Sequence, residues 1–179
     1  MNLELERLAK EGEKAYKRGD FLIAAHLYQT TSQSMLNAGD ELSAAEMLNN
    51  ASVAYLQAGE FLEAFKSTQG TEVTFSQVGD LRREAIALGN LGAALDGLKR
   101  FEEAIQAYER CSQLLKEIEE TELRAAVMQS LSALQLRTGQ QLEALATMKA
   151  GLEGIQHPSV KQRLLKKLIQ TPFKLISRS

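Results

Sequence analysis

The sequence predicts an all-α protein, a solenoid of four helical hairpins, and a regular spacing of glycines is the first reason. Glycine stands at positions 19, 39, 59, 79 and 139, while Lys99 and Glu119 take the two remaining places of this 20-residue period. The text around five of these places is alike, as in RGDFLIAA from Arg18 and AGEFLEAF from Ala58. A fixed period over most of a chain is typical of a solenoid, whose repeats bury a core by stacking on their neighbours.

The segments between these places have the pattern of amphipathic helices. Apolar and small residues recur three and four apart, as Leu48, Ala51 and Tyr55 do, and this is helical spacing. Glycine can end a helix in the left-handed conformation, and the aspartates after Gly19, Gly39 and Gly79 can cap the next helix. We expect seven helices of roughly 17 residues before Gly139 and an eighth over about 141–155. The hairpins then lie at about 3–38, 41–78, 81–118 and 121–156.

Residues 1–156 thus form the predicted repeat domain, and residues 157–179 form a basic C-terminal segment. Pro158 can open a short helix with Val160, Leu164, Leu165, Leu168 and Ile169 on one side, which would cap the last hairpin. After Glu153 there is no acid but six bases. Two alternatives stay open: the segment contacts an anionic membrane surface, or it enters an acidic groove of its own or another copy. The bases considered for such contacts are Lys161, Arg163, Lys166, Lys167 and Lys174.

Composition limits the class of protein. The 21 bases and 23 acids give a net charge of -2, which gives no reason to expect nucleic-acid binding. The single cysteine, Cys111, excludes an internal disulfide framework and favours a reducing compartment, so we expect a cytoplasmic protein. We expect no signal peptide and no membrane span, because no apolar stretch has the required length.

Two segments, NNASVAYLQAGEFLEAF from Asn49 and GNLGAALDGLKRFEEAIQAYERC from Gly89, resemble the tetratricopeptide repeat. On that pattern, Gly92 is the small residue where the two helices cross and Tyr108 fills the next large site. The spacing departs from the family, with 40 residues per hairpin rather than about 34, and so resembles the longer-repeat branch that includes spindle-orientation adaptors and kinesin light chains. The resemblance implies a right-handed superhelix whose first helices line a concave groove for extended or helical peptides.

Side chains repeated every 40 residues would form rows on this groove, and the row Asn50, Asn90 and Ser130 is our first candidate for peptide contact. An amide offers donors and an acceptor to a peptide backbone, although these asparagines could instead bridge neighbouring hairpins. The full candidate set is Asn49, Asn50, Val53, Gln57, Gly89, Asn90, Ala93, Gly97, Gln129, Ser130, Ala133 and Arg137.

Two of these candidates are glycines inside a predicted helix, where each costs about 1 kcal/mol relative to alanine. Gly89 and Gly97 either leave room for a ligand backbone, or ease helix packing and belong to a frayed helix end. The carboxylate clamp with which some members of the family hold chaperone tails is not expected, because Ala9, Glu13, Gly89 and Ala93 stand where bases are needed.

The region from Phe21 to Asp80 holds seven acids and one base, Lys66. A basic or amphipathic partner would suit such a surface; a solvated outer face explains the acids equally.

The sequence gives little support for catalysis or metal binding. We interpret Cys111 as a core residue, and His26 and His157 belong to no metal-ligand spacing. We therefore expect no catalytic residue, metal or cofactor, and predict a non-enzymatic scaffold or adaptor that binds a protein segment. The alternatives are a self-associating structural protein and a peripheral membrane adaptor that uses the basic segment.

Overall fold

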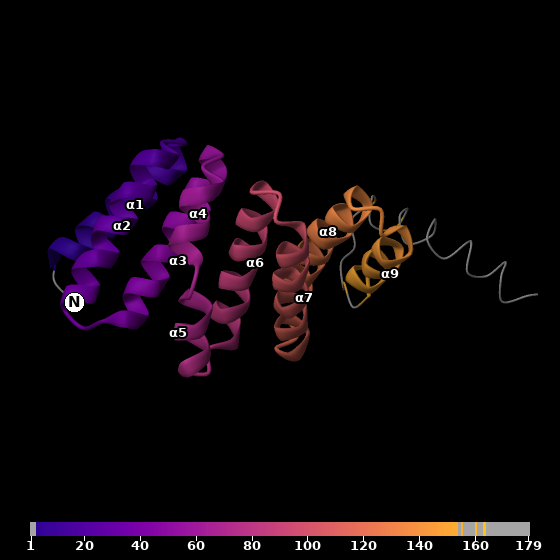
Figure 1. Ribbon diagram of the computed structural model, residues 1–179. Coiled ribbons are helices and arrows are strands. Elements are labelled where there is room, and N and C mark those ends of the chain that lie inside the picture. The colour runs from indigo at the N-terminus through magenta and orange to yellow at the C-terminus, as the bar shows by residue number, and fades with distance from the viewer. Residues whose placement is uncertain (1–2, 154, 156–159, 161–162, 164–179) are drawn as a thin grey trace, which may run out of the picture.

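The computed structural model describes residues 3–153, 155, 160 and 163, and helices follow one another along an elongated stack (Figure 1). The helices are α1 (Leu3–Arg18), α2 (Phe21–Asn37), α3 (Glu41–Ala58), α4 (Phe61–Thr68), α5 (Thr71–Gln77), α6 (Leu81–Gly97), α7 (Phe101–Glu117), α8 (Thr121–Arg137) and α9 (Gln141–Gly151). Each of α1, α3, α6 and α8 packs against the helix that follows it, and each hairpin packs on the next. The predicted all-α repeat solenoid is confirmed.

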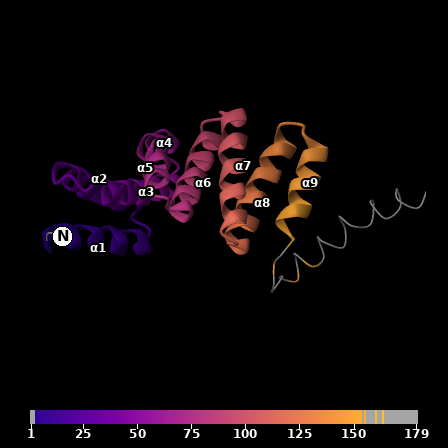
Figure 2. The same ribbon diagram turned by 90° about the horizontal axis from the view of Figure 1, so that it is seen from below.

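The helix axes turn along the stack. Viewed from below, α1 and α2 run across the picture, whereas α8 and α9 run up and down it (Figure 2). The predicted C-terminal capping segment, residues 157–179, lies outside the described residues, apart from the isolated positions 160 and 163. None of the described helices is long and apolar enough to cross a membrane.

The turns between helices follow the 20-residue period. All seven places are left-handed, including the non-glycine residues Lys99 (φ 61°) and Glu119 (φ 58°). The side chains of Asp40 and Asp80 cap the next helix by accepting from the backbone N–H groups of Ser43 and Arg83 at 3.0 and 2.9 Å. The expected cap at Asp20 is wrong, because its carboxylate accepts from the Arg18 guanidinium at 2.9 Å instead.

The crossing points inside the hairpins explain the small residues there. A Cβ atom placed on Gly92 would lie 2.8 Å from the Tyr108 ring, and one placed on Gly12 would lie 3.0 Å from the Tyr28 ring. The contact at Gly92 leaves no room for a side chain, and the one at Gly12 is tight, so glycine lets the tyrosine ring lie on the facing helix.

The second hairpin departs from the prediction, since its second helix is not continuous. It breaks at Gln69 (ψ 122°) and Gly70 (φ 88°), which separate α4 from α5. Thr68 holds the place of Tyr28 and Tyr108, and its hydroxyl lies 3.3 Å from the Ala87 carbonyl oxygen of the next hairpin. The expectation of one helix of roughly 17 residues is therefore wrong here.

The two ends of the stack differ in chemistry. Ala54, Ala94 and Leu134 are fully buried and cluster with residues of the hairpin before them. The equivalent residue of α1 is Lys14, which is exposed. Its neighbours on that side are charged too: Arg7, Glu11 and Arg18. At the other end, Leu145, Met148 and Leu152 are half-buried. A charged outer side is how terminal repeats of a solenoid stay soluble.

Candidate functional site

The predicted groove residues lie on α3, α6 and α8, and we call this side of the first helices, together with the matching side of α1, the first-helix face. Asn49 is buried, with 6% of its surface exposed. Half-buried residues are Asn50, Val53, Gly89, Asn90, Ala93 and Gly97. Exposed residues are Gln57, Gln129, Ser130, Ala133 and Arg137.

Asn49 and Asn90 contact each other across two hairpins. Asn90 Nδ2 donates to Asn49 Oδ1 at 3.3 Å, and the Thr68 hydroxyl donates to the same oxygen at 3.2 Å. The amide nitrogen of Asn90 therefore bridges two hairpins, which was the alternative to ligand contact. Its Oδ1 atom forms no hydrogen bond among the described residues, and neither does the side chain of Asn50. These acceptor and amide groups stay available to a ligand.

Several charges on the first-helix face are paired with each other. The Arg137 guanidinium donates to both carboxylate oxygens of Asp96 at 2.6 Å. Arg83 Nη1 lies 3.3 Å from Glu46 Oε2, and Lys17 pairs with Glu13. Exposed ion pairs stabilise the fold by about 1 kcal/mol or less, but each of these pairs is neutral as a unit.

Four of the seven acids between Phe21 and Asp80 are engaged, since Asp40 caps a helix while Glu46, Glu63 and Asp80 pair with bases. Arg83 Nε donates to Asp80 at 2.6 Å, and Lys66 to Glu63 at 2.7 Å. The backbone hydrogen bond from Arg83 is the largest cause that lowers the pKa of Asp80, and the one from Ser43 does the same for Asp40. The base count within the segment missed Arg83, which lies just beyond it. Because several of these acids are already paired within the protein, the structure supports a basic partner less than the count of acids and bases does.

The two helix glycines have different surroundings. A Cβ atom on Gly97 would lie 2.2 Å from the Phe61 ring, so packing of that ring explains the glycine. A Cβ atom on Gly89 would meet only Cys111 Sγ, at 3.5 Å, which is an ordinary contact. Packing therefore does not require glycine at position 89.

Arginine–aromatic contacts at the hairpin junctions were missed by the sequence reasoning. The Arg100 guanidinium lies 4.7 Å from the Phe65 ring centre, and that of Arg83 lies 5.1 Å from the Phe75 ring centre. Such contacts contribute about 0.5–1 kcal/mol at exposed sites. Their sequence signal is a basic residue at or just after a turn with an aromatic residue in the preceding hairpin.

Reactive side chains are few within the described part of the chain. Cys111 is buried, and this burial raises its pKa to about 12, so the thiol stays protonated. No group of three or more histidines, cysteines or acids in the described ranges is placed to hold a metal ion.

The stacked hairpins and their turns define an all-α repeat solenoid. Residues 79–156 match the family model of the tetratricopeptide repeat, which confirms the predicted resemblance in this part of the chain. No curated protein has a sequence that matches this chain.

Two solved structures are similar in shape. One is a crystal structure of nearly identical TPR-like repeats of Podosopora anserina, described as a kinesin light chain, with a TM-score of 0.74 and 14% identity over 98% of this chain and 97% of that one. The other, MamA AMB-1, has a TM-score of 0.45 and 18% identity over 90% and 97%. The likeness to the first structure, at this low identity, shows the fold alone.

Proposed function

We propose that this protein is a non-enzymatic scaffold or adaptor that binds a peptide or helical segment of a partner protein along the first-helix face. The observation that supports this best is the row of polar side chains at 40-residue spacing, Asn50, Asn90 and Ser130. The amide of Asn50 and the Oδ1 atom of Asn90 can bond to a backbone N–H or C=O group without breaking a hydrogen bond of the described fold. Tetratricopeptide repeats generally mediate protein–protein interaction, which agrees with this use of the face.

The side chains next to this row leave space for a ligand. Ala93 and Ala133 are small, Gly89 carries no side chain, and none of the three is fully buried. Small neighbours let a peptide backbone come within hydrogen-bond distance of the amides. The clamp that some relatives use for chaperone tails needs bases at Ala9, Glu13 and Ala93, so capture of such tails is not part of this proposal.

Head-to-tail stacking of copies is disfavoured by the end of the stack at α1. Stacking in register would bury Lys14 and Glu11 of one copy against Leu145 and Met148 of another. Burying charged groups against apolar ones without partners costs several kcal/mol. This cost argues against stacking of copies. We further propose that residues 1–156 act as the binding domain, that the protein works in the cytoplasm, and that residues 157–179 cap the C-terminal end of the stack.

A peptide library selected against the protein tests the proposed function. The informative variant is Asn50→Ala, because that side chain holds no hydrogen bond of the described fold. Asn90→Ala would also remove the bond to Asn49, so it is a weaker test. The matched control is Gln113→Ala, which removes an exposed amide from α7, an outer helix.

The expected result is a peptide motif selected by the parent and by Gln113→Ala but weakened by Asn50→Ala. All three proteins should keep the same circular dichroism spectrum. If all three proteins select the same peptide motif equally well, Asn50 is not part of the binding site. No selection by any of them would contradict peptide binding, and light scattering would then test self-association.

A further inference from the structure

The outer side of the first hairpin carries an apolar pair that the other hairpins lack. Ile23 and Leu27 lie one turn apart on α2, and Ile23 exposes 55% of its surface. The positions equivalent to Ile23 in the later hairpins are all acids: Glu63, Glu103 and Glu143. Leu27 has small or polar counterparts, namely Ser67, Ala107 and Thr147. A terminal hairpin that only kept the stack soluble would be polar at these positions, so the apolar pair needs another explanation.

Contacts inside the stack show what the position of Leu27 faces. Its counterpart Ser67 accepts a hydrogen bond at 3.4 Å from Gln29 of the hairpin before it. The counterpart Ala107 is buried in a cluster against which Phe65 of the preceding hairpin packs. This position therefore faces the preceding hairpin wherever there is one. Within the described residues no hairpin precedes α1 and α2, so their outer side is open to solvent.

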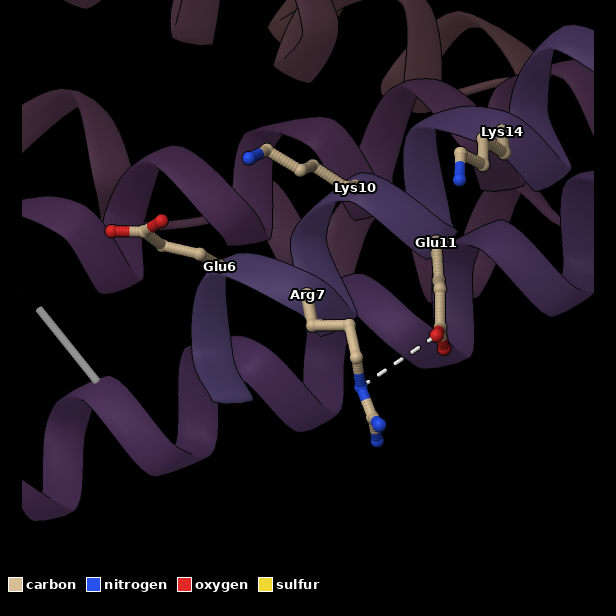
Figure 3. Close-up of a pocket in the computed structure, with 5 residues that line it drawn as sticks. All are labelled: Glu6, Arg7, Lys10, Glu11 and Lys14. Carbon is tan, nitrogen blue, oxygen red and sulfur yellow. Dashed lines mark ion pairs between the residues drawn. The ribbon is translucent and has the colours of Figure 1, made fainter. Parts of the chain in front are cut away.

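Ile23 and Leu27 line an open hollow of about 250 Å³ between α1 and α2. The other residues that line it come from α1: Glu11, Lys14, Ala15 and Arg18. A second hollow of about 250 Å³ follows α1 and shares Glu11 and Lys14 with the first; Figure 3 shows the five residues that line it. The two hollows together extend over residues 6–18 of α1, about 18 Å along the helix axis. This length suits about three turns of another helix.

Bases outnumber acids around these hollows. The bases are Arg7, Lys10, Lys14 and Arg18, and the acids are Glu6 and Glu11. Arg7 pairs with Glu11 at 3.7 Å, as the dashed line in Figure 3 marks, and Arg18 pairs with Asp20 at 2.9 Å. A second copy of the chain would bring the same excess of bases to the contact, and residues 157–179 hold six bases and no acidic side chain. Charge complementarity therefore favours an acidic partner over either of these occupants.

We infer that the outer side of the first hairpin is a second binding surface, and that its occupant is an acidic amphipathic helix of a partner protein. The helix packs along α1 in the way that α2 packs on α3. Two apolar residues four apart on the partner share one face of its helix and cover Ile23 and Leu27. Acids beside them meet Lys14 and Arg18. Because Ile23 and Leu27 lie on α2 and not on the first-helix face, this surface adds a second partner to the one proposed above.

Selection from a phage-displayed library of helical peptides against three forms of the full chain tests the inference. Ile23→Glu places in the hollow the acid that stands at this position in the other hairpins, so the variant should fold. The matched control is Leu22→Glu. Leu22 is the neighbouring exposed apolar residue, does not line the hollow, and has an acid, Glu102, as its counterpart in the third hairpin. All three proteins should give the same circular dichroism spectrum.

The parent and Leu22→Glu should select helices that carry two apolar residues four apart with acids beside them, whereas Ile23→Glu should not. Fluorescence anisotropy with one selected helix gives the size of the effect. Ile23→Glu should weaken binding about tenfold or more, because the isoleucine is no longer buried. Replacing the acids of the helix by glutamine should weaken its binding to the parent about threefold. Asn50→Ala should bind the helix as the parent does.

Three results would overturn the inference: no helix selected by the parent, equal binding by Ile23→Glu, or an equal loss with Leu22→Glu. Equal binding of the glutamine version would contradict the acidic character of the partner. If light scattering shows a dimer of the parent that Ile23→Glu dissociates, the occupant is a second copy and not a partner helix. The proposed function is tested separately, because a peptide that binds the first-helix face should bind Ile23→Glu and the parent equally.

Discussion

The second and third hairpins share one repeat register but solve the crossing of their helices differently. In the third, the ring of Tyr108 lies on Gly92 and α7 is continuous. In the second, Ser52 and Thr68 take these places, and the second helix breaks into α4 and α5. Both crossings are buried. The 20-residue period therefore specifies the turns. Whether the second helix is continuous or broken instead correlates with the pair of residues at the helix crossing.

The largest expected effect comes from giving the third hairpin the threonine of the second. Tyr108→Thr removes a ring that is buried with Leu131 and Leu134, and a loss of about 3 kcal/mol in unfolding free energy is expected from comparable large-to-small changes. Urea unfolding followed by circular dichroism measures it. Tyr108→Phe is the control, since it keeps the ring. A threonine variant as stable as the phenylalanine variant would show that the ring does not support the crossing.

Gly92→Ser tests the other half of the same pair. A Cβ atom at this position lies 2.8 Å from the tyrosine ring, so a loss of about 2 kcal/mol from overpacking is expected. When combined with Tyr108→Thr, the serine gains the space it has at Ser52, and the double variant should be more stable than the sum of the two losses predicts. Strict additivity in the double-mutant cycle would mean that the two residues do not depend on each other.

The break itself depends on Gly70. Its φ of 88° is left-handed, and no atom lies within 4 Å of a Cβ placed there, so the only cost of a side chain is backbone strain. Gly70→Ala should lower the unfolding free energy by about 1–2 kcal/mol. Gly70→Asn should lose less, because asparagine tolerates this conformation. Equal stability of the alanine variant would indicate that the helix can close without the break.

A substitution at Gly89 tests whether the absence of a side chain there makes room for a ligand. Gly89→Ala should raise the unfolding free energy by up to about 1 kcal/mol, because alanine favours the helix and its Cβ meets Cys111 Sγ at an ordinary 3.5 Å. If the same variant also loses the selected peptide, the glycine leaves room for the ligand backbone. Unchanged peptide binding would remove Gly89 from the candidate site.

Much of the fold follows from the sequence because turn chemistry is local. The spacing placed all seven turns, and the residues at these turns are left-handed even where lysine and glutamate replace glycine. The resemblance to the tetratricopeptide repeat placed Gly92 at a crossing. The break before α5 was missed although its signals are present. Gly70 falls outside the 20-residue spacing, and threonine at 68 stands where tyrosine stands at 28 and 108.

The site could be predicted only as a set of rows. The spacing indicates which side chains share a position, as it does for Asn50 and Asn90. It does not give the distance between layers, which decides that Asn90 reaches Asn49 and that Arg83 reaches Glu46. It also did not show that Phe61 fills the space beside Gly97, because that contact joins residues of two hairpins.

The smallest expected effect compares the turns of the two hairpins. Gly59 and Lys99 hold the same place, and both are left-handed, with φ of 78° and 61°. A lysine costs about 1–2 kcal/mol in this conformation, whereas glycine loses about 0.5–1 kcal/mol of chain entropy on folding. Lys99→Gly should therefore raise the unfolding free energy by about 0.5–1 kcal/mol, and Gly59→Lys should lower it by a similar amount. If urea unfolding shows no gain for Lys99→Gly, the Lys99 side chain compensates for its backbone strain through contacts that the glycine turn lacks.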